Sequence, residues 1–230
     1  APPARAPVEP LFTPVPSRFA KRPPEPPAAQ QRHSDVAIVG LSGRYAGSDN
    51  VRQLWQHLKA GEHCIAQVPA ERWDWRRYFD RTPGTAGRIY TPWGGFIGQI
   101  DRFDPLFFHI SPREALKMDP QERLFLEEAY HCISDAGYTP ARLAERQRVG
   151  VFVGVMNGTY SHQSSYWSVA NRVSYQFNFQ GPSLAVDTAC SSSITALHLA
   201  LQSLERGDSD CALVGGVSLL VDPVHYMGLS

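Results

Sequence analysis

The sequence has few cysteines, no net charge and no long hydrophobic run. Only four of its 230 residues are cysteine, and they show neither a disulfide framework nor the paired spacing of a zinc site. The 22 basic and 22 acidic residues cancel, without a basic cluster of the kind that binds nucleic acid. No apolar run approaches the roughly 18 residues of a membrane span. These absences predict a cytoplasmic protein with reduced thiols that binds no nucleic acid, membrane or metal.

Proline gathers near the beginning of the chain. Ten of the 19 prolines lie within residues 1–32, among alanine, arginine and glutamine and without an apolar period. Pro-rich segments of this kind are semi-extended and bury too little apolar surface to fold. We therefore predict a disordered linker over residues 1–33, which joins the following domain to neighbouring domains of a larger polypeptide.

From residue 34 onward, strand-like and helix-like segments alternate. Apolar runs of strand length predict buried strands at 35–41, 149–155, 184–186 and 211–220. One helical pattern follows a cap at Ser48 or Asp49 and ends at Gly61. Further helical patterns cover 120–136, 167–177 and 191–204. Residues 62–112 are irregular and rich in aromatic side chains, which we expect to fill a core. The alternation predicts an α/β layered fold.

A cysteine stands at one junction between strand and helix. In the run AVDTACSSS, Cys190 follows the strand 184–186 and precedes the helix 191–204. Unpaired N–H groups and the dipole at a helix N-terminus favour the thiolate form of a cysteine, which suits a nucleophile. Asp187, Thr188 and Ser191 are expected to hold the turn through side-chain hydrogen bonds.

This cysteine has three possible roles: an acyl-accepting nucleophile, a redox thiol, or a small buried residue. Small neighbours that leave room for a substrate favour the first role, and the lack of a second cysteine nearby disfavours the second. A cysteine hydrolase is disfavoured because no paired His and Asp/Glu block is present. The helix is apolar over most of its surface, so we expect it to be buried, with His198 as a core histidine.

Several blocks of the sequence resemble one family. The block GPSLAVDTACSSSITALHLALQSLERGDSDCALVGGVSLL is similar to the active-site block of β-ketoacyl synthases, the condensing domains of polyketide synthases, which share the thiolase fold. The match extends through DVAIVGLSGRYAG, DPQERLFLEEAYHCISDAGY and VGVFVGV and covers residues 34–230. The final DPVHYMGLS is similar to modular synthases whose acyltransferase acts in trans.

The resemblance implies that residues 34–230 are the N-terminal half of a ketosynthase domain, the first of two halves of a thiolase-like fold. Cys190 would receive an acyl chain from the phosphopantetheine arm of an acyl carrier protein and extend it by decarboxylative condensation with a malonyl-type thioester. The resemblance also implies a homodimer and a domain that binds no cofactor of its own. By analogy, Met156 and Asn157 would line the acyl tunnel, although a purely structural loop is the alternative.

One departure from the family is large. The family uses two histidines from later blocks, one of them HGTGT-like, and none of the eight histidines present stands in such a block. We therefore expect this stretch alone to be inactive in condensation, and to fold poorly because the strands 149–155 and 211–220 would expose faces. A competing hypothesis is a non-elongating domain that transfers acyl chains or docks carrier proteins.

Overall fold

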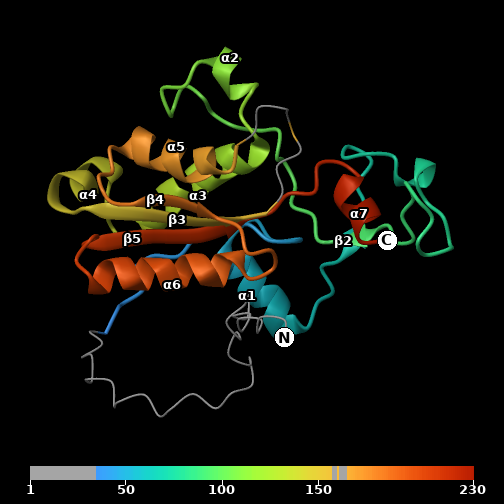
Figure 1. Ribbon diagram of the computed structural model, residues 1–230, viewed down its shortest axis with the longest axis horizontal. Helices are drawn as coiled ribbons and strands as arrows, with labels where there is room; N and C mark the ends of the chain where they lie inside the picture. Colours follow the sequence, from blue (N-terminus) through green and yellow to red (C-terminus); the bar gives the residue numbers. More distant parts are fainter. Residues whose placement is uncertain (1–34, 157–159, 161–164) are drawn as a thin grey trace, which may run out of the picture. The chain divides into compact units, whose positions relative to one another are not determined.

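The computed structural model describes residues 35–156, 160 and 165–230 (Figure 1). The linker predicted over residues 1–33 lies outside this part of the chain and stays a prediction. Among the described residues, no helix is long and apolar enough to cross a lipid bilayer.

A parallel sheet of three strands forms the centre of the fold. Strand β3 (Val149–Val155) pairs with β4 (Ser183–Val186) on one side and with β5 (Cys211–Val217) on the other. Every residue of β3 is buried, because helices cover both faces of the sheet. The three predicted strands in this region are confirmed, with β5 ending at Val217 rather than at residue 220.

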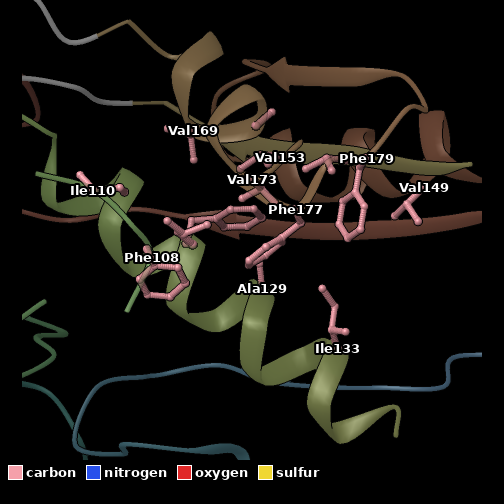
Figure 2. Close-up of a cluster of buried hydrophobic side chains, with 14 of the residues drawn as sticks. Phe108, Ile110, Ala129, Ile133, Val149, Val153, Val169, Val173, Phe177 and Phe179 are labelled. Atoms are coloured by element: carbon pink, nitrogen blue, oxygen red, sulfur yellow. The ribbon is translucent and has the colours of Figure 1, made fainter. Parts of the chain in front are cut away.

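Helices α3 (Pro120–Asp135) and α5 (Trp167–Phe177) cover one face of the sheet (Figure 1). The carboxylate of Asp119 accepts a hydrogen bond from the N–H of Gln121, and Pro120 occupies the first helical position, where no N–H is needed. Both helices bury apolar side chains against the sheet, and Figure 2 shows this cluster. It includes Phe108, Ile110, Ala129, Ile133, Val149, Val153, Val169, Val173, Phe177 and Phe179.

Helix α6 (Ser192–Glu205) covers the opposite face of the sheet (Figure 1). Its small residues Ala196, Ala200 and Ser203 are buried, whereas Ile194 on its outer face is 70% exposed. The expectation that this helix is buried is therefore wrong for its outer face in the described chain. The expectation of a core histidine at 198 is also wrong, because His198 is exposed and its Nε2 lies 3.0 Å from the side-chain nitrogen of Gln202.

Residues 35–41 do not form the predicted strand. The segment has no regular structure, and its apolar side chains are exposed, with Ile38 at 87%. The segment is bonded to α3, where Asp135 accepts a hydrogen bond of 2.9 Å from the N–H of Leu41. A strand needs a neighbour for its backbone groups, and within the described residues no strand pairs with this segment.

The remaining elements are short. Helix α1 (Val51–Ala60) is capped by Asn50, not by Ser48 or Asp49, and ends at Gly61, which has a φ of 66°. The other short elements are β1 (Ala66–Gln67), the 3-10 helix η1 (Trp75–Arg77), β2 (Trp93–Gly94), α2 (Pro112–Ala115), α4 (Pro140–Arg146) and α7 (Val224–Gly228). Strands β1 and β2 pair in antiparallel fashion.

Aromatic side chains between residues 62 and 112 pack against α7. The ring of Trp73 meets that of Tyr226 edge to face at 5.7 Å, and the Tyr226 hydroxyl donates a 3.1 Å hydrogen bond to the carbonyl of Trp93. Val68 and Ile89 are buried in the same cluster. The prediction that these aromatics fill a core is confirmed for Trp73, Trp75, Tyr78 and Phe96, which pack against this cluster, but not for Trp93 and Phe107, which are 53% and 51% exposed.

Candidate active site

The turn between β4 and α6 carries Cys190 and has a strained backbone. Ala189, the residue before the cysteine, has a φ of 55°, in the left-handed region that residues with a Cβ rarely occupy. Asp187 Oδ1 accepts a 3.0 Å hydrogen bond from the N–H of Ala189. The turn therefore holds an unfavourable backbone conformation with the help of a side chain that immediately follows the strand.

Hydroxyl groups link the turn to the first helical turn of α6. The Ser192 hydroxyl accepts from the N–H of Thr188 at 2.9 Å and donates to the carbonyl of Ala189 at 2.7 Å. The Ser191 hydroxyl donates to the carbonyl of Thr188 at 2.8 Å, and the hydroxyls of Thr188 and Thr195 lie 2.9 Å apart. Sequence reasoning selected Ser191 but missed Ser192, which is buried and makes two bonds that span the cysteine.

Cys190 is an exposed thiol, two residues before the first residue of α6. Cys132 and Cys211 differ from it because they are partly buried, and desolvation raises the pKa of both thiols. An exposed thiol beside a helix N-terminus is open to an incoming electrophile, and the helix end favours negative charge there. This arrangement suits nucleophilic attack on a carbonyl or thioester carbon.

Two adjacent glycines within β5, Gly215 and Gly216, allow other elements to approach closely. A Cβ on Gly215 would come within 2.7 Å of the ring of Phe125 on α3, and one on Gly216 would collide with the hydroxyl of Ser193. The two glycines therefore permit a close approach on both faces of the sheet. One of the two contacts, at Ser193, lies directly after the turn that carries Cys190.

A cavity of about 410 Å³ lies beside β5, between residues 40–45, α3 and the start of α6. Its lining includes Leu41, Arg44, Leu124, Phe125, Ser193 and Leu219. Among the described residues that line it, neither Cys190 nor Met156 is found. The carbonyl of Met156 accepts a 2.9 Å hydrogen bond from the hydroxyl of Tyr166. Asn157 lies outside the described residues, so the assignment of Met156 and Asn157 to an acyl tunnel stays a prediction.

The fold and the turn define an α/β protein with a cysteine presented between a strand and a helix. Residues 33–230 match the family model described as "Beta-ketoacyl synthase, N-terminal domain". The chain therefore belongs to the β-ketoacyl synthase family, and the part of the family that it matches is the N-terminal domain. This finding confirms the family and the thiolase-like layered fold that the sequence predicted.

Relatives of known name are polyketide synthases. Polyketide synthase PksM of Bacillus subtilis is 58% identical over 206 residues, which cover 90% of this chain and 5% of that protein. Polyketide synthase ThaG of Burkholderia thailandensis is 48% identical over 219 residues, covering 89% of this chain and 4% of that protein. The chain thus spans about one-twentieth of the length of these relatives.

Solved ketosynthase domains share the fold. The oxazolomycin ketosynthase domain OzmH KS7 of Streptomyces albus matches with a TM-score of 0.81 and 45% identity, over 84% of this chain and 35% of that one. The ketosynthase from module 6 of the bacillaene synthase of Bacillus subtilis, with one cysteine changed to serine, matches with a TM-score of 0.79 and 43% identity. That match covers 84% of this chain and 34% of the solved chain.

Proposed function

We propose that this chain is the N-terminal half of a ketosynthase domain in a modular polyketide synthase, with Cys190 as the acyl-accepting nucleophile. The observation that carries the proposal is the exposed Cys190 thiol at a turn that hydroxyl and carboxylate groups hold against α6. The similarity to solved ketosynthase domains supports the same conclusion.

In the first step, the Cys190 thiolate attacks the carbonyl carbon of an acyl chain bound to the phosphopantetheine thiol of an acyl carrier protein. A new C–S bond forms, the tetrahedral intermediate collapses, and the carrier thiolate leaves and takes up a proton. Ser191 and Ser192 act on the turn rather than on the acyl group, because their hydroxyls bond to backbone groups of Thr188 and Ala189.

In the second step, a malonyl-type thioester on a carrier protein loses carbon dioxide, and the electron pair of the broken C–C bond attacks the Cys190 thioester. A new C–C bond forms and the Cys190 thiolate leaves. The family resemblance assigns the histidines that assist this step to later sequence blocks. The domain would bind no cofactor of its own, because phosphopantetheine is attached to the carrier protein.

The proposed partners are an acyl carrier protein, a second copy of the domain and neighbouring domains reached through residues 1–33. The similarity of DPVHYMGLS to synthases with a separate acyltransferase supports a module of that type. The cytoplasm is the proposed location, since the substrates would be carried on intracellular carrier proteins.

The test uses the full-length protein and a small acyl thioester, followed by mass mapping of the cysteine peptides. Acyl mass is expected on Cys190 ahead of Cys64, Cys132 and Cys211, and Cys190→Ala should abolish it while Cys132→Ala should not. Equal labelling of all four cysteines would contradict the proposal.

A second measurement separates elongation from acyl transfer alone. Malonyl carrier protein is added to the acyl-loaded enzyme, and both carbon dioxide and a chain longer by two carbons are measured. Detection of both carbon dioxide and the elongated chain supports condensation. Acyl transfer without carbon dioxide release supports the non-elongating alternative and contradicts the condensing function.

A further inference from the structure

A second cysteine, far from the nucleophile turn in sequence, lies beside an imidazole. Cys64 follows the end of α1, and its Sγ lies 3.7 Å from Nδ1 of His57 in the last turn of that helix. The other ring nitrogen of His57, Nε2, lies 3.4 Å from a carboxylate oxygen of Glu62. The imidazole of His57 therefore lies between the carboxylate of Glu62 and the thiol of Cys64.

The carboxylate determines which ring nitrogen can accept a proton. A neutral imidazole carries one N–H, and the Glu62 carboxylate, which only accepts, favours that N–H on Nε2. The lone pair of Nδ1 then faces the hydroxyl of Ser48, 2.9 Å away, and the thiol of Cys64. His57 is therefore positioned to take a proton from Cys64, as a base does for a nucleophilic thiol.

Cys64, Cys132 and Cys211 are all half-buried, so the proposal rests on the imidazole beside Cys64 and not on a difference in exposure. Desolvation, the largest cause in each case, raises the pKa of the Cys132 and Cys211 thiols. The chain neighbours of Cys64, His63 and Ile65, are exposed. An electrophile in solution can approach Cys64 from this side.

We propose that Cys64 is a second nucleophilic thiol, a modification site that exchanges with small disulfides and does so independently of Cys190. His57 Nδ1 takes the thiol proton, and the Cys64 thiolate attacks one sulfur of the disulfide. A mixed disulfide forms, the S–S bond of the reagent breaks, and its second sulfur leaves as a thiolate that takes up a proton. Cys64 is oxidised and the small disulfide is reduced to one thiol, so electrons balance without a further reagent.

The test uses the full-length protein with Cys190→Ser, so that the proposed nucleophile cannot contribute. Oxidised glutathione is the probe, and the rate of mixed-disulfide formation at each cysteine is followed near neutral pH by peptide mass mapping. Cys64 is expected to react about tenfold faster than Cys132 or Cys211. Equal rates at the three cysteines would overturn the proposal, whatever the outcome of acyl loading at Cys190.

Three variants examine the role of the imidazole. His57→Gln should lower the rate at Cys64 by about tenfold, and Glu62→Gln should lower it less, because Glu62 acts only through the ring. Ser48→Ala should raise the rate, since Nδ1 then serves the thiol alone. Lys59→Gln, an exposed change on the same helix, is the matched control and should leave the rate unchanged.

The rates at Cys132 and Cys211 report on folding in each variant, because unfolding would expose both thiols and raise their rates as well. An unchanged rate at Cys64 in His57→Gln, with constant rates at Cys132 and Cys211, would show that the imidazole does not activate the thiol. A lower rate in His57→Gln together with a higher rate in Ser48→Ala supports the proposed proton transfer, since a general loss of structure cannot produce opposite changes.

Discussion

A Cβ on Gly154 of β3 would lie 2.5 Å from the backbone nitrogen of Ser193 in α6. Real Cβ atoms do not approach backbone this closely, so the first turn of α6 rests on the sheet at a distance that only glycine permits. Because Cys190 lies three residues before Ser193, this contact sets the distance between the sheet and the turn that carries Cys190.

Gly154→Ala should therefore move the start of α6 and disturb Cys190. We expect a loss of about 1–3 kcal/mol in the free energy of unfolding, the usual cost of overpacking, together with a changed rate of alkylation at Cys190. Urea denaturation and mass mapping of the full-length protein measure the two effects. Gly98→Ala is the matched control, because a Cβ there meets no atom within 4 Å. Equal stability of the two variants would refute the close contact.

The left-handed backbone at Ala189 gives a second prediction. Ala189→Gly removes a Cβ that costs about 1–2 kcal/mol in this region, although glycine adds freedom to the unfolded chain. The net change should lie between zero and a gain of about 1 kcal/mol, whereas Ala189→Val should destabilise the protein. Thermal and urea unfolding measure both. Ala141→Gly on the exposed side of α4 is the control and should lose about 1 kcal/mol, the opposite sign.

The same sequence pattern led to a correct prediction of a strand for β3 and to a wrong one for residues 35–41. Both segments are apolar runs of strand length, and such a run indicates burial without showing which strand will pair with it. Val149–Val155 has a neighbour on each side in the described chain, and residues 35–41 have none there. Pairing depends on segments distant in sequence, so local pattern cannot supply it.

The candidate site was predicted in part. Small residues around Cys190 in sequence indicated an accessible thiol after a strand. The role of Ser192 could not be predicted, because which of three adjacent serines turns inward depends on the backbone of Ala189. The sequence indicated correctly that most of the surface of α6 is apolar. It did not indicate that the small residues Ala196 and Ala200 are the ones that face the sheet.

A buried carboxylate supplies the third prediction. The side chain of Glu122 is 6% exposed, and its Oε1 accepts a 2.9 Å hydrogen bond from Nε of Arg172 on α5, which also contacts Glu114 at 2.7 Å. Arg172→Met would leave the Glu122 carboxylate without this partner and should destabilise the protein by roughly 3 kcal/mol.

Arg148→Met is the matched control for this change, because Arg148 pairs with Asp210 at a position where the two side chains are 55% and 43% exposed. Exposed ion pairs contribute little, so the loss there should be much smaller. Urea denaturation of both variants at one pH gives the comparison. If Arg148→Met proved as damaging as Arg172→Met, burial of Glu122 would not be the source of the effect.

Glu127 on α3 has an unusual affinity for its proton. Burial, the largest cause, raises the pKa of Glu127 to about 7, and the nearby carboxylates of Glu128 and Asp104 act in the same direction. The cations Arg44 and Arg123 oppose this rise. The ordinary value is 4.5, so the folded protein holds a proton that the unfolded chain releases between about pH 4.5 and about pH 7.

The stability contribution of protonated Glu127 is therefore complete below about pH 4.5 and is lost as the pH rises through about 7. Glu127→Gln cannot ionise, so the unfolding free energy of the variant, minus that of the unchanged protein, should increase from about pH 5 to about pH 8. Urea denaturation at several pH values measures this difference. Glu145→Gln, which changes an exposed carboxylate on α4, should follow the unchanged protein at every pH. Parallel curves for Glu127→Gln and the unchanged protein would mean that Glu127 ionises equally in the folded and unfolded states.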